Sequence, residues 1–173
     1  APAIGQRLAS AARSERAATG ELFHACLEHY APPGAARDLA LLAQQLGVSD
    51  DRYVTIAQSA RELIDLPHLM RFFNPDYFLR ARNECDILDY EGKPQRLDRV
   101  VEFDEEVWVL DYKTGADTLL ETDETLQQRY SDQLTRYARL LAQLHANKSI
   151  HAALLLADGR LIPCPIESKC LER

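Results

Sequence analysis

Residues 97–115 read LDRVVEFDEEVWVLDYKTG, and this stretch decides the fold. Two apolar segments flank the acidic dipeptide Asp104-Glu105, a polar break that favours a tight turn between two antiparallel strands. Counting outward from that turn places Asp98 on the first strand near Asp111 on the second. Two carboxylates that meet on one sheet repel each other, and a cation between them relieves the repulsion. The stretch therefore predicts a hairpin that carries an acidic site.

The second of these strands ends in charged residues. Alternation along residues 107–113 places Asp111 and Lys113 on the same face, and Thr114-Gly115 then breaks the strand. Both charged groups should therefore lie at the rim of the sheet, where a pocket can open to solvent. Taken alone, the Asp111 and Lys113 pattern is more typical of an ion pair at a strand end. Together with the first strand it favours a site for Mg²⁺, which prefers hard oxygen ligands.

Composition limits the protein class. A chain of 173 residues with 46% hydrophobic side chains can bury one substantial core, so we expect a single domain over residues 1–173. The sequence has neither the roughly 18 uninterrupted apolar residues of a membrane span nor a signal peptide, so we expect a cytoplasmic protein with no membrane partner. The net charge of −7 argues against general neutralisation of phosphates, so any DNA contact must be local.

The remaining pattern predicts an α+β fold with a central mixed sheet. Residues 1–75 should be mainly helical, and residues 76–173 should form the sheet and one long helix. Apolar spacing, caps and breaks predict helices over residues 14–30, 35–46, 51–66 and 125–146, and strands over residues 77–88, 95–103, 106–111, 150–156 and 160–166. The apolar stripe of the long helix comprises Tyr130, Leu134, Tyr137, Leu141 and Leu144.

Polar residues on two of the predicted helices are further candidates. His24 follows Gly20 by one turn, and the missing side chain of that glycine would let the helix approach the sheet closely. The alternative for His24 is a core histidine bonded to a carbonyl. Gln133 interrupts the apolar stripe one turn before Tyr137. Their alternative is a polar residue beneath the sheet and a core tyrosine.

These segments together resemble a known family. The strings LDRVV (97–101), LDYKTG (110–115) and QLxxY (133–137), preceded by GxxxH (20–24), are similar in order and spacing to the motifs of the RecB-type nucleases of the PD-(D/E)XK superfamily. The resemblance implies a restriction-endonuclease-like α/β/α fold and a Mg²⁺-dependent deoxyribonuclease, with Mn²⁺ as an alternative ion. One departure is Arg96, where the family usually has a glycine; we expect it to alter strand shape rather than chemistry.

The resemblance also assigns roles. It implies that His24, Asp98 and Asp111 ligate the metal, with the backbone carbonyl of Tyr112 as a further ligand. Lys113 would position the attacking water and offset the negative charge that grows on the phosphate.

It further implies that Gln133 and Tyr137 face the active site and contact the DNA backbone or the lysine. Glu84 resembles an acidic position on the family's first strand, where it would orient the lysine or contact the metal through water. A surface cross-strand pair is the alternative for Glu84.

Some relatives hold an iron–sulfur cluster, but here Cys26 follows the histidine and only Cys164 and Cys170 lie near the C-terminus, so we expect none. Members of the family are frequently joined to a helicase motor, and a start at Ala1 without methionine suggests a segment excised from such a bacterial helicase–nuclease. If a helicase motor delivers the DNA strand, the nuclease needs few phosphate contacts of its own, which would explain its net negative charge. The few DNA contacts would then fall to Arg96, Arg99, Arg129, Arg136 and Arg139, each of which is equally typical of a solvated surface.

Two other functions fit the same motifs. One is a catalytically inactive nuclease-like module that guides DNA or supports assembly. The other is an unrelated metal-dependent phosphoesterase acting on a small substrate, against which the paired Gln133 and Tyr137 argue.

Overall fold

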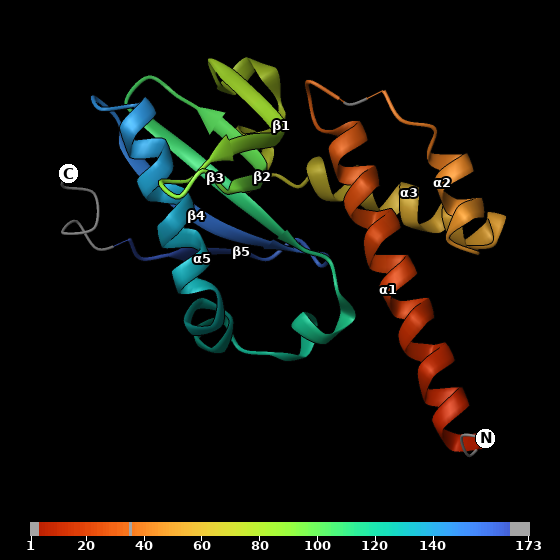
Figure 1. The fold of residues 1–173 in the computed structure, drawn as a ribbon. Helices are drawn as coiled ribbons and strands as arrows, with labels where there is room; N and C mark the ends of the chain where they lie inside the picture. Colours follow the sequence, from red (N-terminus) through yellow and green to blue (C-terminus); the bar gives the residue numbers. More distant parts are fainter. Residues whose placement is uncertain (1–3, 35, 167–173) are drawn as a thin grey trace.

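The computed structural model describes residues 4–34 and 36–166, with side chains from residue 11 onward. It is an α+β fold with one mixed sheet, as expected (Figure 1). In chain order its elements are α1 (Ile4–Tyr30), α2 (Leu39–Gln45), α3 (Asp50–Ile64), α4 (Met70–Phe73), the 3₁₀ turn η1 (Pro75–Tyr77), β1 (Arg80–Leu88), β2 (Pro94–Glu102), β3 (Glu106–Lys113), the 3₁₀ turn η2 (Ala116–Leu120), α5 (Asp123–Leu144), β4 (Ser149–Leu156) and β5 (Leu161–Cys164).

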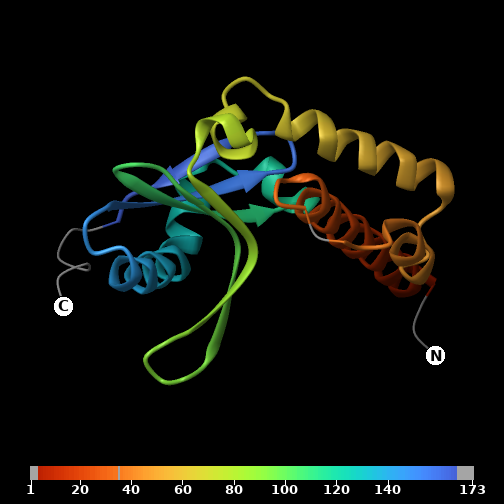
Figure 2. The ribbon, with the colours of Figure 1, turned by 90° about the horizontal axis from the view of Figure 1, so that it is seen from above.

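The five strands lie in the sheet in chain order, β1-β2-β3-β4-β5. Strands β1, β2 and β3 form the expected antiparallel meander, and β4 then pairs parallel to β3. Two parallel strands need a long crossover connection, and α5 supplies it between β3 and β4. The β1–β2 hairpin extends well beyond the rest of the sheet (Figure 2).

Helices cover both faces of the sheet. On β3, Val107 and Val109 pack into the apolar cluster shared with α5. Leu110 and Tyr112 belong instead to the cluster formed with the N-terminal helices. Alternate residues of β3 therefore belong to two different cores, one on each face of the sheet. A mixed sheet between layers of helices agrees with a restriction-endonuclease-like fold.

The apolar stripe of α5 holds for most of its length. Leu134, Tyr137 and Leu141 are buried against the sheet. Leu144 was expected on the same stripe, but it is 65% exposed. It is the last residue of the helix and lines an open groove with Ile87 instead of entering the core.

Several element boundaries differ from the expected ones. Helix α1 begins at Ile4 rather than at residue 14, because the alanine-rich stretch before residue 14 forms helix by propensity. Helix α2 begins at Leu39, where the Asp38 side chain caps it. Strand β5 ends at Cys164, before Pro165, which has no N–H for the sheet. None of the described helices has the length and apolarity that a bilayer crossing requires.

Candidate active site

The acidic residues lie where the pairing of β2 with β3 stops. The last paired residues are Arg99 and Leu110. One step further along the two strands lie Asp98 and Asp111. The Asp98 Oδ2 atom accepts a hydrogen bond from the backbone N–H of Tyr112 at 2.6 Å. The carboxylate thus replaces the main-chain acceptor that a continued ladder would supply, and the strands open into the site.

Lys113 is held on the α5 side of the site. Its Nζ lies 2.6 Å from Asp111 Oδ2. It also donates to Gln133 Oε1 at 3.3 Å, and Gln133 Nε2 in turn donates to the hydroxyl of Tyr137 at 2.8 Å. The ring of Tyr130 lies 4.2 Å from the ammonium. Of the two α5 residues that were expected to face the site, Gln133 therefore contacts the lysine directly and Tyr137 contacts Gln133.

Asp111 is buried in an electrostatically costly place. Burial and the nearby charge of Asp98 raise the pKa of the Asp111 carboxyl to about 6, although Lys113 and His24 oppose the shift. The Asp111 Oδ2 atom accepts no hydrogen bond of good geometry. Its contact with the Lys113 ammonium is therefore an ion pair without a hydrogen bond. A divalent cation beside this carboxylate would remove the cost of burying its charge.

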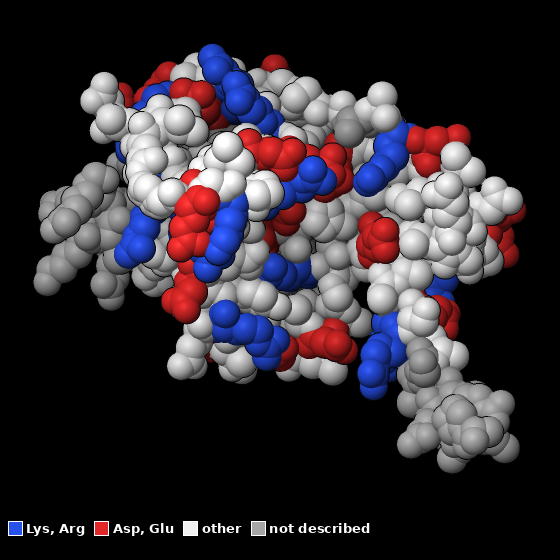
Figure 3. Space-filling view, in the orientation of Figure 1, with Lys and Arg blue, Asp and Glu red and all other residues white. Residues whose placement is uncertain are grey.

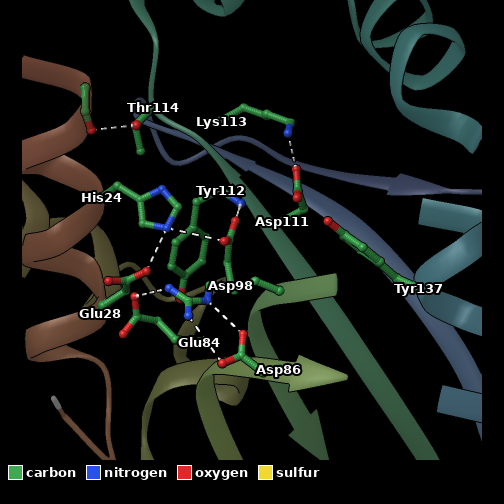
Figure 4. A network of polar contacts seen from close by, with 12 residues as sticks. His24, Glu28, Glu84, Asp86, Asp98, Asp111, Tyr112, Lys113, Thr114 and Tyr137 are labelled. Atoms are coloured by element: carbon green, nitrogen blue, oxygen red, sulfur yellow. Dashed lines mark hydrogen bonds and ion pairs between the residues drawn. The ribbon is translucent and has the colours of Figure 1, made fainter. Parts of the chain in front are cut away.

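His24 completes a second part of the site from α1 (Figure 4). Its Nε2 atom lies 3.3 Å from Asp98 Oδ1 and 2.9 Å from Glu28 Oε1, and the three groups could together hold a metal ion. Burial by itself lowers the pKa of His24, but hydrogen bonds and charge from Asp98 and Glu28 outweigh it and raise the pKa to about 10. Asp111 lies outside this cluster and turns toward the lysine.

Glu28 was not among the residues selected from the sequence. The signal was available, because Glu28 follows His24 by four residues and the two therefore share one face of α1. Its carboxylate was overlooked because an acidic residue at this spacing is more often an ordinary surface group. Here its side chain is only 6% exposed.

The helix that carries His24 is fastened to the end of β3. The Thr114 hydroxyl donates to the carbonyl of Gly20 at 2.8 Å. A Cβ atom at Gly20 would lie 3.6 Å from the Thr114 carbonyl oxygen, which is ordinary contact distance. The helix therefore packs against the strand end, but a methyl group would fit at this position, so the approach does not depend on the missing side chain of Gly20.

The backbone carbonyl of Tyr112 faces the same opening. The N–H and C=O groups of a strand residue point to the same side, and the Tyr112 N–H points to Asp98. The carbonyl is therefore directed to the open side of the β2–β3 ladder. The tyrosine ring packs edge-on against His24, with ring centroids 5.3 Å apart.

Arg99 contradicts the expectation that it contacts DNA. The residue is fully buried, with 0% of its surface exposed. Its Nε and Nη2 atoms donate to the carbonyl of Phe72 at 3.0 and 2.8 Å, and Nη1 donates to Asn83 Oδ1 at 2.6 Å. The alternation that sends Asp98 into the site sends its neighbour into the core beneath the N-terminal helices.

Asn83 carries this network to the end of α1. Its amide nitrogen lies within hydrogen-bonding distance of the carbonyls of Glu28, Ala31 and Pro33, at 3.2, 2.7 and 3.1 Å. Arg99 and Asn83 together therefore tie the C-terminal turn of α1 to β1 and β2. They hold the helix that bears His24 against the strand that bears Asp98.

Glu84 adopts the cross-strand alternative. Its carboxylate lies 3.6 Å from Arg96, which also forms a two-point contact with Asp86 at 2.9 and 3.2 Å. Glu84 has a left-handed backbone, with φ of 47°, where the hairpin departs from regular geometry. Arg96 is accordingly engaged within the hairpin.

The other predicted DNA-contacting arginines lie on α5. Arg129 pairs with Glu121, while Arg136 is exposed. Arg136 and Arg139 line a groove of about 400 Å³ against the tip of the β1–β2 hairpin, which contributes Lys93 together with Asp89 and Glu91. Acidic and basic side chains alternate over the face seen in Figure 3, without a broad basic surface.

The cysteines are distributed over both cores. Cys26 is buried with the N-terminal helices, and Cys164 is buried on the α5 side of the sheet. Cys85 is a further free thiol, and Cys170 lies outside the described residues. The expectation of no iron–sulfur cluster stays a prediction.

A mixed sheet with two carboxylates and a lysine at the ends of neighbouring strands defines a restriction-endonuclease-like protein. Residues 4–162 match the family model described as the PD-(D/E)XK nuclease superfamily. The chain belongs to this superfamily, whose nucleases generally use divalent metal ions. A search of curated proteins found no match.

Proposed function

We propose that this chain is a Mg²⁺-dependent deoxyribonuclease that hydrolyses phosphodiester bonds. The observation that carries the proposal is the buried Asp111 carboxylate, which lies beside Asp98 and in contact with Lys113. Such a group is costly unless a cation shares its site, and the imidazole of His24 and the carbonyl of Tyr112 border the same opening. This donor set suits Mg²⁺ or Mn²⁺.

A bound metal would activate a water molecule and neutralise charge on the scissile phosphate. Asp98 and Asp111 would hold it, with Asp98 oriented by the Tyr112 N–H. Lys113 would stabilise the phosphate in the transition state, because its ammonium projects from the same strand end. An ammonium has three donors, so Lys113 would still have one for phosphate beside its contacts with Gln133 and Asp111.

We further propose that the chain acts as the exonuclease module of a helicase–nuclease in DNA repair or recombination. Its net charge of −7 and the mixed charges in Figure 3 support delivery of the strand by a partner motor. Arg136 and Arg139 beside Lys93 would supply a limited set of phosphate contacts. A catalytically inactive module is the weaker alternative, because His24, Asp98, Asp111 and Lys113 converge on one opening.

End-labelled linear DNA and closed circular DNA, each incubated with Mg²⁺ or with excess EDTA, test the proposal. We expect metal-dependent degradation of linear DNA, abolished by EDTA and by Asp111→Asn. Asp51→Asn, an exposed carboxylate on α3, is the matched control and should cut normally. Failure of the wild-type chain to cut either DNA with Mg²⁺ or Mn²⁺ would overturn the nuclease assignment, and cutting of circles would overturn the exonuclease assignment.

A further inference from the structure

We propose that Glu28 is a further ligand of the divalent cation, so that α1 contributes two ligands one turn apart. This inference rests on the proposed metal site and adds to it a residue from outside the sheet. The ion would lie among His24 Nε2, Glu28 Oε1 and Asp98 Oδ1, whose ligand atoms all lie within 4.8 Å of one another. Asp111, which contacts Lys113 in the metal-free protein, would turn from the lysine to join them.

The separations fit a single ion. Neighbouring ligands of an octahedral ion at a bond length of ~2.1 Å lie ~3 Å apart. His24 Nε2 is 2.9 Å from the Glu28 carboxylate and 3.3 Å from that of Asp98. The three groups therefore need little rearrangement to become adjacent ligands.

The histidine nitrogen that Glu28 contacts indicates whether Glu28 would bind the metal or only orient His24. A carboxylate that only orients a metal-bound histidine accepts from the ring nitrogen that does not bind the metal. Glu28 instead contacts Nε2, the nitrogen that also faces Asp98. Both carboxylates thus point to one position, as Figure 4 shows for His24, Glu28 and Asp98.

The surroundings of Glu28 also favour a cation. Its side chain is 6% exposed, and its other oxygen has Arg37 as a partner at 3.5 Å. Arg37 approaches from outside the site with a side chain that is 45% exposed. Oε1 is left facing His24 and the partly buried Asp98 carboxylate. Two carboxylates this close together need a cation between them, a role that the protonated His24 fills without metal and that a bound divalent ion would take over.

Mn²⁺ binding to the DNA-free protein, measured by isothermal titration calorimetry, tests the inference independently of cleavage. Glu28→Gln should weaken affinity by about tenfold or more. Glu62→Gln, the same change at an exposed site on α3, should not alter it. Circular dichroism on each variant checks the fold.

Pulsed electron paramagnetic resonance on the Mn²⁺ complex distinguishes ligation from support. The wild type should show nitrogen coupling from one imidazole, that of His24. Glu28→His places a second imidazole at the same position, and we expect coupling from two. Coupling from one imidazole in Glu28→His, or Glu28→Gln affinity within about twofold of wild type, would overturn the inference and leave the nuclease assignment standing. Absence of Mn²⁺ binding by the wild type would overturn both.

Discussion

The Asp98 carboxylate accepts a hydrogen bond from the backbone N–H of Tyr112 at 2.6 Å, and its other oxygen faces His24. One side chain thus caps the end of the β2–β3 ladder and would also supply a ligand to the proposed metal ion. The two roles depend on different properties, since the cap needs only an acceptor and the metal needs the charge.

Replacing Asp98 should separate these roles. Asp98→Asn keeps an oxygen acceptor for Tyr112, so we expect near wild-type folding with loss of metal binding and cleavage. Asp98→Ala should lose both, at a cost of about 1 kcal/mol in stability relative to Asp98→Asn. Urea unfolding with EDTA and metal titration of both variants measure this. Equal stability of the two variants would show that the cap contributes nothing.

Lys113→Ala should slow cleavage on the order of 10²- to 10³-fold while metal and DNA affinity are retained, because the ammonium acts chiefly in the transition state. Lys113→Arg should rescue only in part, since the guanidinium is longer and planar. Single-turnover cleavage and melting temperature, measured on the same preparation of each variant, distinguish a catalytic role from a structural one. A simple ion pair with Asp111 predicts the reverse, namely lower stability with cleavage per folded molecule little changed.

Asp111→Asn should stabilise the metal-free protein while abolishing metal binding. The folded-state pKa of Asp111 is about 6, above its usual 3.8, so the ionised form costs stability above pH 6 and the cost disappears below about pH 4. We expect the variant to be more stable than wild type by about 1 to 3 kcal/mol at pH 8. Urea unfolding at pH 4 and pH 8 with EDTA measures the stability of both proteins. If Asp111→Asn were as much more stable than wild type at pH 4 as at pH 8, the ionised Asp111 carboxylate would not be the cause.

The protonated His24 should stabilise the metal-free protein, and this stabilisation should be lost at alkaline pH. Its folded-state pKa of about 10 exceeds the usual 6.5, so its contribution is complete below pH 6.5 and is lost as pH rises through 10. The stability difference between wild type and His24→Gln should therefore shrink from pH 6 to pH 10. Urea unfolding in EDTA across this range is the measurement. A difference independent of pH would mean that the imidazole is neutral between Asp98 and Glu28.

Arg99→Met should destabilise the fold by about 3 kcal/mol or more, because it strands the Phe72 carbonyl and Asn83 without their buried partner. Arg99→Lys should not restore stability, since an ammonium cannot reproduce the forked contact. Arg136→Met, at an exposed position, should change stability by only about 0.5 kcal/mol. Thermal unfolding separates these outcomes, and a fully stable Arg99→Met would show that the hydrogen bonds of Arg99 contribute nothing to stability.

Local pattern was sufficient for the strands of the sheet and for the faces of residues 107–113. The turn after Phe103 and the two-residue period of β3 predicted that Asp98 lies near Asp111, and that Asp111 and Lys113 share a face. The helical period likewise predicted that Gln133 and Tyr137 lie together, since residues four apart on a helix are neighbours.

Tertiary packing decided the rest of the site. Glu28 reaches the site only because α1 packs against the sheet, where Gly20 accepts a hydrogen bond from Thr114, 94 residues away in the sequence. Arg99 has the sequence features of a surface arginine, yet a carbonyl from α4 and an amide from β1 receive it in the core. Periodicity determines which face of an element a side chain occupies, because it depends only on neighbouring residues. What that face meets depends on the approach of distant elements, which the local sequence does not encode.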